Sequence, residues 1–181
     1  NAFLTKGESK LHVFAPKEFN GLKGVNVTSI AFGTTDGTAT SHSAAVSYPP
    51  TTFFVLYNDN SQDSSWGSNQ QYQLGYQYLN GTYAPVYDIG SILTRNRKIR
   101  EYAVSGRHTF ALGQETTDTN VYEMYVCGDG RVGQLGAGPS LQERSTLLQT
   151  QSAKKIAVGD WHSLYVDKNN TAWGAGDNTD G

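Results

Sequence analysis

The sequence predicts an all-β protein built from repeated four-stranded units, and three observations carry that prediction. First, the 181 residues include 20 glycines and 11 tyrosines, while only 17% of the residues are charged, a balance typical of turn-rich β structure. Second, no segment shows a convincing amphipathic helical pattern, and the best candidate, residues 90–102, is short and interrupted by polar residues. Third, two short motifs recur in the same order along the chain, which indicates a repeat architecture.

The first motif is a short apolar strand followed by glycine and then histidine. It occurs at residues 102–108 and again at residues 156–162. A third copy begins at residues 30–33 and reaches a histidine after an insertion. A histidine at a fixed repeat position can bond neighbouring groups while its ring packs. We therefore expect a structural role for the three motif histidines, His42, His108 and His162.

The second motif is an aromatic residue or cysteine followed by glycine, with Gln-Leu-Gly some residues later. It spans residues 66–75 and residues 127–136, and a third copy begins at Trp173-Gly174. Gly75 and Gly136, which close the two Gln-Leu-Gly triplets, permit turns with positive φ. We expect Trp66 and Trp173 to fill space between neighbouring units.

Strands expected between the motifs follow in order along the chain. Residues 53–57 are a continuous apolar run after a Pro-Pro turn signal, which indicates a buried strand. Residues 121–126 follow a polar turn and show no helical period. Residues 164–166 and 171–173 flank the polar stretch 167–170, which predicts a hairpin.

A repeat of roughly 50–65 residues that holds about four strands is typical of a β-propeller blade. We place one blade at residues 30–101, a second at 102–155 and the start of a third at 156–181. Residues 1–29 read as the tail of a preceding blade. A closed propeller needs roughly four to eight blades. We therefore expect residues 1–181 to be a fragment of a longer propeller, or a partial ring that a second chain completes.

Together the two motifs resemble the repeat of the RCC1 family (regulator of chromosome condensation). The resemblance covers most of residues 28–181 and implies a propeller of seven blades in the complete family fold. The sequence departs from the family pattern in an insertion at residues 34–41, in Cys127 where tryptophan is usual, and in Tyr72 where glycine is usual. The predicted fold is thus all-β, with RCC1-like β-propeller blades in a partial propeller of about three four-stranded blades.

Patterns that could carry catalysis or hold a cofactor are better explained by the repeats. Residues 128–133 spell Gly-x-Gly-x-x-Gly, but glycine and proline follow where a dinucleotide site needs a helix. Histidine and serine are adjacent at 42–43 and 162–163, yet neighbours on a strand point to opposite faces. The four histidines and one cysteine show no zinc spacing. We expect no catalytic residue, no cofactor and no metal site.

Two surface features predict a protein interface. Tyrosines, which are enriched at interfaces, crowd the segment after the first Gln-Leu-Gly. The basic cluster at residues 95–100 could contact an acidic partner or a phosphate backbone, but a net charge of -2 argues against nucleic acid. The predicted interface residues are Tyr76, Tyr78, Tyr83, Tyr87, Arg95, Arg97, Lys98 and Arg100.

The sequence predicts a non-catalytic protein–protein interaction module, a scaffold or structural subunit of a larger complex. It has no apolar run long enough to insert into a membrane, and we expect an intracellular location. The resemblance adds two alternatives. One is guanine nucleotide exchange on a small GTPase, as in the founding family member, and the other is inhibition of an enzyme by a propeller face.

Overall fold

The computed structural model describes residues 27–34, 51–57, 64–69, 71–75, 83–88, 99–139 and 143–179, and for some strands only the backbone. Within these residues the protein contains antiparallel strands and no helix, so the all-β prediction is confirmed. Accordingly, no helix in the described part of the chain is long and apolar enough to cross a membrane.

In the part of the chain that the structure describes, eleven strands form three separate sheets, which we call blades 1, 2 and 3. Blade 1 has the order β1 (Val27–Thr34), β2 (Thr51–Tyr57), β3 (Ser64–Ser68), β4 (Tyr83–Asp88). Blade 2 has the order β5 (Glu101–Val104), β6 (His108–Glu115), β7 (Tyr122–Asp129), β8 (Glu143–Ala153). Blade 3 comprises β9 (Lys155–Val158), β10 (His162–Val166) and β11 (Ala172–Gly176), with β10 in the middle.

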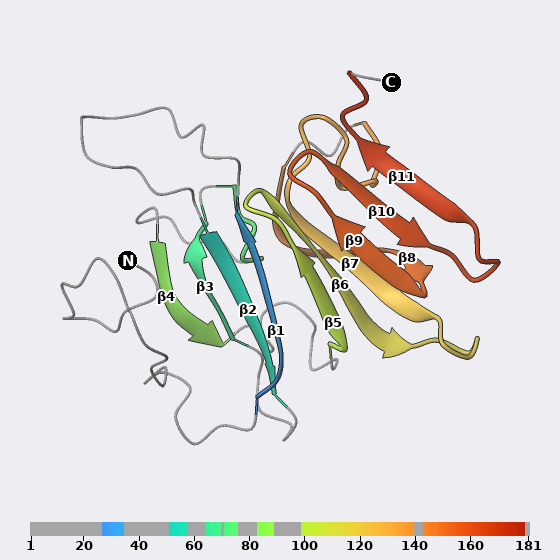
Figure 1. Ribbon diagram of the computed structural model, residues 1–181, viewed down its shortest axis with the longest axis horizontal. Coiled ribbons are helices and arrows are strands. Elements are labelled where there is room, and N and C mark those ends of the chain that lie inside the picture. Colours follow the sequence, from blue (N-terminus) through green and yellow to red (C-terminus); the bar gives the residue numbers. More distant parts are fainter. Residues whose placement is uncertain are drawn as a thin grey trace.

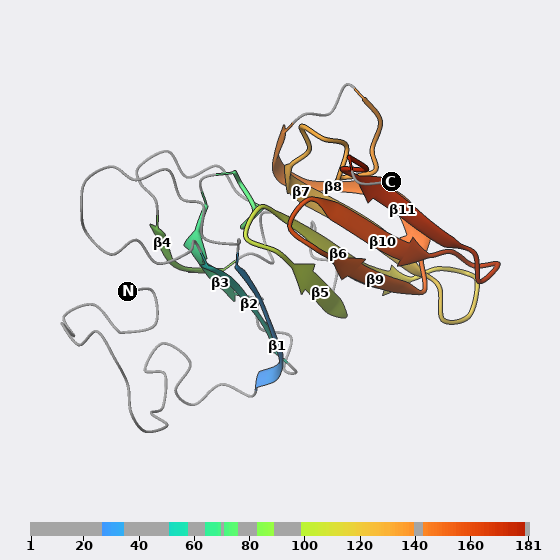
Figure 2. The same cartoon turned by 45° about the horizontal axis from the view of Figure 1, so that its top comes forward.

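The blades lie face against face in chain order, as Figures 1 and 2 show from two directions. Strands β1 and β2 contact β5, and β5 and β6 contact β9. Each blade therefore begins with a strand that lies against its neighbour. A partial propeller of successive antiparallel blades fits this arrangement.

The core lies between the blades. One cluster joins blades 1 and 2, and its buried members are Leu74, Ile99, Tyr102, Ala111, Tyr125 and Cys127. The other joins blades 2 and 3 and includes Phe110, Leu112, Met124, Val126, Leu135, Ile156 and Tyr165. The side chains of β6 alternate between the two clusters, so this strand is buried on both faces. Burial of apolar area between blades is the main stabilising contribution.

The predicted hairpin in blade 3 is formed by β10 and β11. Its turn is held by Asp167, whose Oδ1 accepts hydrogen bonds from the backbone N–H groups of Asn169 and Thr171. Asn170 completes the turn with a φ of 64°, a left-handed conformation that asparagine tolerates. The Asp side chain thus satisfies backbone groups that the tight turn leaves unpaired.

Strand pairing corrects the position assigned to His42. Val104 faces Thr109 in blade 2, and Phe32, at the same repeat position as Val104, faces Phe53 in blade 1. Thr52 therefore stands in blade 1 where His108 stands in blade 2. The second strand of blade 1 begins only at Thr51. The insertion therefore extends past residue 41 and includes His42, which lies outside the described residues.

Pairing also corrects the alignment of the second motif. Gly128 faces His108 in blade 2, and Gly176 faces His162 in blade 3. Trp173 is therefore the counterpart of Tyr125, two residues before Cys127. The alignment of the third copy by sequence was therefore wrong by two residues. The error arose because Trp173-Gly174 and Ala175-Gly176 both place a glycine directly after another residue of the strand.

Positions that are buried in the middle blade are exposed on the outer faces of the other two. Phe110 is 1% exposed in blade 2, and Leu164, at the same position in blade 3, is 52% exposed. Similarly, Tyr102 is buried, while Ile30 at its position in blade 1 is 60% exposed. Both outer sheet faces thus present apolar side chains of the kind that neighbouring blades bury.

Candidate functional site

The Gln-Leu-Gly segment of blade 1 packs against the start of blade 2. Gln73 is fully buried, and its Nε2 donates a hydrogen bond to the Gly106 carbonyl at 2.9 Å. Thr109 Oγ1 donates to the Gln73 carbonyl at 2.8 Å, and Leu74 enters the core between the blades. Gly75 turns the chain away with a φ of 79°. The motif recurs because it joins one blade to the next.

The second Gln-Leu-Gly repeats the local turn of the first at the junction of blades 2 and 3, but its buried Gln134 Nε2 makes no hydrogen bond of the kind that Gln73 makes to the next blade. Gln134 Oε1 accepts from the Val132 N–H at 3.1 Å, as Gln73 Oε1 accepts from the Gln71 N–H at 2.9 Å. Leu135 is buried, and Gly136 has a φ of 62°. Both predicted motif glycines therefore adopt the positive φ that their turns require.

His108 is fully buried where blade 2 meets blade 3. Its Nδ1 lies 3.1 Å from Ser105 Oγ in its own blade, and its Nε2 lies 2.6 Å from Ser163 Oγ of blade 3. Burial, opposed by the Asp129 charge, lowers the pKa of His108 to about 4. The neutral imidazole is hydrogen-bonded on both nitrogens, so it connects blade 2 to blade 3. Because the ring is enclosed, a substrate cannot reach it.

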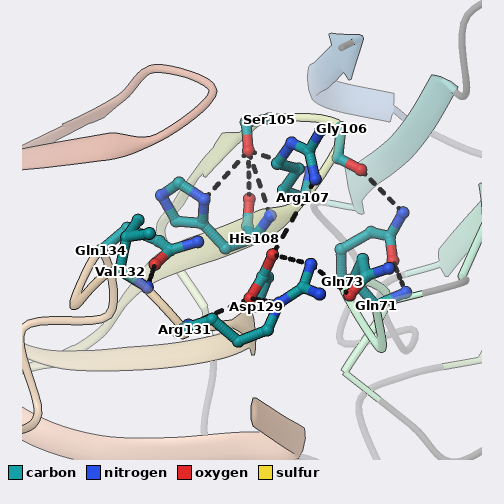
Figure 3. A network of polar contacts seen from close by, with 10 residues as sticks. All are labelled: Gln71, Gln73, Ser105, Gly106, Arg107, His108, Asp129, Arg131, Val132 and Gln134. Atoms are coloured by element: carbon teal, nitrogen blue, oxygen red, sulfur yellow. Dashed lines mark hydrogen bonds and ion pairs between the residues drawn. The ribbon is translucent and has the colours of Figure 1, made fainter. Parts of the chain in front are cut away.

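Asp129 is the centre of a second polar group at the same end of the blades, drawn in Figure 3. Its side chain is fully buried. Its Oδ1 accepts from Arg131 Nε at 2.9 Å, and its Oδ2 accepts from Arg131 Nη2 at 2.7 Å. Arg107 Nη1 lies 4.0 Å from Oδ2. Burial alone would raise the pKa of Asp129, but the hydrogen bonds and charge of Arg131 hold it below the usual value.

The two arginines extend this group to all three blades. Arg107, in the β5–β6 turn, places its guanidinium 3.7 Å from the ring centroid of Trp161 in the β9–β10 turn, a cation–π contact. Arg131 Nη2 donates to Gln71 Oε1 of blade 1 at 3.3 Å. The network therefore ends at the turns on one face of the partial propeller, where Arg131 is 55% exposed.

We expect Arg131→Gln to lower the free energy of unfolding by about 2 kcal/mol, because Asp129 would stay ionised and buried with only the backbone N–H of residue 131 and the distant Arg107 to compensate its charge. The double variant Asp129→Asn/Arg131→Gln removes both charges and should recover about half of that loss. Urea denaturation of the wild type and both variants measures the difference. A double variant no more stable than the single one would contradict this explanation.

Residues 128–133 cover the end of β7 and the first part of the turn that follows it, and no helix begins there. Gly128 and Gly133 have φ values of 103° and 86°, and the chain continues into the buried Gln134-Leu135. Among the described residues no group of three His, Cys, Asp or Glu side chains could hold a metal ion.

Most of the predicted interface lies outside the described residues, namely Tyr76, Tyr78, Arg95, Arg97 and Lys98. Tyr83 and Tyr87 lie on β4, where they pair with Ser68 and Ser65 of β3. Arg100 is exposed just before β5, and its guanidinium lies 4.5 Å from the centroid of the Tyr122 ring. The predicted interface therefore stays a prediction.

The other repeat-motif residues occupy different surroundings in different blades. Trp66 lies on β3 opposite Phe53. In blade 3, His162 is exposed, and Trp173 is 50% exposed and stacks on Tyr165 with ring centroids 6.3 Å apart.

Sequence reasoning missed Arg107, Asp129 and Arg131. A signal was present, because glycine followed by aspartate occurs at 128–129 and at 176–177. Both aspartates donate their N–H to the carbonyl of the residue before the motif histidine, at 3.0 Å in each blade. Their partners could not be foreseen, because the residues that they meet differ between the repeats.

The blades and their junctions define an RCC1-like partial β-propeller, and the comparisons with known proteins agree. Residues 153–181 match the family model described as "Regulator of chromosome condensation (RCC1) repeat". The resemblance found in the sequence is therefore confirmed for blade 3 by the family model, and the fold by solved structures. A search of curated protein sequences found no significant match.

Three solved structures illustrate the likeness of fold. Human WBSCR16 has a TM-score of 0.61 at 16% identity, over 84% of this chain and 36% of that protein. Yeast RCC1 (Prp20), solved bound to Kap60, has a TM-score of 0.58 at 24% identity, over 69% of this chain and 30% of that chain. Prp20p from Saccharomyces cerevisiae has a TM-score of 0.57 at 24% identity, over 69% and 31%. This chain spans about a third of the length of these structures.

Proposed function

We propose that the chain is a non-catalytic protein–protein interaction module, acting as a scaffold or structural part of a larger assembly inside the cell. One observation carries the proposal. The side chains with catalytic potential at the blade junctions, His108, Ser163 and Asp129, are buried and bonded to other parts of the protein. The exposed features are apolar sheet faces and an arginine-bearing turn face, which suit protein contacts.

We further propose that more propeller blades cover the outer faces of blades 1 and 3. The support is internal to the molecule, because Tyr102 and Phe110 of blade 2 are covered by neighbouring blades. Their counterparts Ile30 and Leu164 are large apolar side chains exposed to solvent. Sequence flanking residues 1–181, or a second chain, would supply those blades.

The second candidate function is guanine nucleotide exchange on a small GTPase. The observation that favours it is the likeness of fold to yeast Prp20p, whose structure is reported together with its binding to Gsp1p and histones. We propose the exchange function from this likeness of fold.

Affinity capture on the immobilised chain, followed by mass spectrometry, tests the first proposal, and release of labelled GDP from small GTPases tests the second. We expect a stable stoichiometric partner and unchanged GDP release. Accelerated release without a stable partner would replace the scaffold function by exchange.

A further inference from the structure

Blade 3 lies at one end of the row of described blades, and one of its faces points away from blade 2 (Figure 1). Strand β10 places His162 and Leu164 on this face, because residues two apart on a strand share a side. Both side chains are exposed. Ala157 of β9 pairs with Leu164 and is exposed beside it. We call these three residues the terminal face.

The same positions in blade 2 show how a face of this repeat is covered. The counterparts of the terminal face are His108, Phe110 and Ala103. His108 is fully buried, and its Nε2 lies 2.6 Å from Ser163 Oγ of blade 3. Phe110 belongs to the core between blades 2 and 3, and Ala103 packs against that core. A covering blade therefore gives a hydroxyl to the histidine and apolar side chains to the positions beside it.

The two histidines stand on the same backbone frame. The carbonyl of each accepts a hydrogen bond from the N–H three residues earlier, at 3.0 Å in blade 2 and 2.8 Å in blade 3. A glycine pairs with each histidine at very close approach. A Cβ atom on Gly128 would lie 2.7 Å from His108 Cα, and one on Gly176 would lie 2.6 Å from His162 Cα. Blade 3 therefore presents His162 as blade 2 presents His108.

Blade 3 differs from blade 2 next to the histidine ring. Ser105 Oγ lies 3.1 Å from His108 Nδ1, whereas Gly159 stands at the position of Ser105 and has no side chain to offer to His162. Burying a ring nitrogen without a hydrogen-bond partner costs free energy. An element that covers the terminal face must therefore bring a hydrogen-bonding group to His162 itself.

We propose that the terminal face is covered by an antiparallel propeller blade whose second strand presents a serine or threonine hydroxyl to His162. The inference rests on the proposal above that further blades cover the outer faces, and it specifies the chemistry of one of them. Blades 2 and 3 both hold a hydroxyl at the required position. Thr109 contacts the Gln73 carbonyl of blade 1, and Ser163 contacts His108 of blade 2.

Blade 1 of a second copy of this chain fits the terminal face less well. Its β2 holds Phe53 at the position of Thr109 and Ser163, as the pairing of the first two strands in each blade shows. A phenylalanine cannot accept or donate the hydrogen bond that a buried His162 needs. The occupant that we infer is therefore a blade other than blade 1.

The direct test extends the chain after residue 181 with a copy of residues 134–179 that carries His162→Gln. Gly176 corresponds to Gly128, so residue 181 corresponds to residue 133 and the copy continues the repeat in register. It supplies a fourth strand to blade 3 and a further blade with Ser163. We expect diethyl pyrocarbonate to modify the original His162 about tenfold more slowly than in residues 1–181, measured by mass spectrometry of tryptic peptides.

A second extended chain keeps the test informative if the first does not fold. It carries a copy of residues 134–153 followed by a copy of residues 100–139, so that Thr109 of a copied blade 2 meets His162. We expect the same protection of His162.

Variants of the first extended chain isolate the hydroxyl. In the appended copy, Ser163→Thr should keep the midpoint of urea unfolding, and Ser163→Ala should lower it by about 0.5 M, because a buried His162 nitrogen loses its partner. When the original His162 is also changed to Leu, Ser163→Ala should leave the midpoint unchanged. This double-mutant cycle is the matched control, because it separates the pair from other effects of the serine.

Three results would overturn the proposal. If His162 stays as reactive in both extended chains as in residues 1–181, no blade covers this face, and the proposal of further blades on blade 3 fails with it. If His162 is protected but Ser163→Ala leaves the midpoint unchanged, the covering blade stands and the hydroxyl is rejected. If residues 1–181 dimerise in light scattering and His162 becomes protected as the dimer forms, the occupant is a second copy of this chain.

Discussion

Gly128→Ala is expected to lower the free energy of unfolding by about 3–5 kcal/mol, by combining backbone strain with a clash between main chains. Gly128 is the last residue but one of the motif strand β7 and has a φ of 103°. A Cβ atom at this position would lie 2.5 Å from the Arg107 carbonyl oxygen and 2.7 Å from His108 Cα. Both of these are backbone atoms, which cannot move aside as a flexible side chain can.

The matched control is Gly133→Ala, in the same turn. Gly133 also has a positive φ, 86°, but a Cβ there would meet no atom within 4 Å. The Gly133→Ala variant should therefore show only the cost of placing alanine at a positive φ, which lowers the free energy of unfolding by about 1 kcal/mol. Thermal and urea denaturation of both variants gives the comparison. Equal destabilisation of the two would show that the close approach of β7 to the β5–β6 turn contributes nothing.

Residues that repeat were predicted well from the sequence. His108 and the two Gln-Leu-Gly triplets all lie where successive blades meet. His108 bonds Ser163 of the next blade, and the two motif leucines, Leu74 and Leu135, enter the two cores between the blades. Such contacts depend on the fold alone, so they leave a periodic pattern. The strands around them could also be located, since residues 53–57 and 164–173 carry apolar runs and turn signals.

Residues that differ between blades were predicted poorly. His42 resembled a motif histidine by sequence, but strand pairing places Thr52 at that position, because the insertion moves the second strand. The polar network around Asp129 escaped prediction for a related reason. Arg107 and Trp161 occupy the same repeat position, and their contact appears only when two successive turns stack. Equivalent positions that hold different residue types leave no repeated motif in the sequence.

The pH dependence of stability should reveal the buried histidine. The His108 ring stays neutral in the native protein down to pH about 4, whereas in the unfolded chain it takes up a proton near pH 6.5. Between these values the unfolded state binds more protons, so stability falls as the pH falls. Above pH 6.5 the ring is neutral in both states and contributes no pH dependence. Over this range the free energy of unfolding falls by about 3 kcal/mol in total, and most of the fall is complete near pH 4.

His108→Gln tests this expectation, because it removes the titrating ring and keeps a side chain that can donate and accept hydrogen bonds. Urea denaturation between pH 7 and pH 4 should give a falling free energy of unfolding for the wild type and a much flatter one for His108→Gln. His162→Gln changes the exposed counterpart in blade 3 and leaves the buried His108 ring in place. This variant should therefore still lose most of the stability that the wild type loses on acidification. The Asp129 carboxyl, whose pKa is lowered, acts only below this window. If His108→Gln lost stability on acidification as steeply as the wild type, the contact between His108 and Ser163 would not be what makes the junction of blades 2 and 3 sensitive to acid.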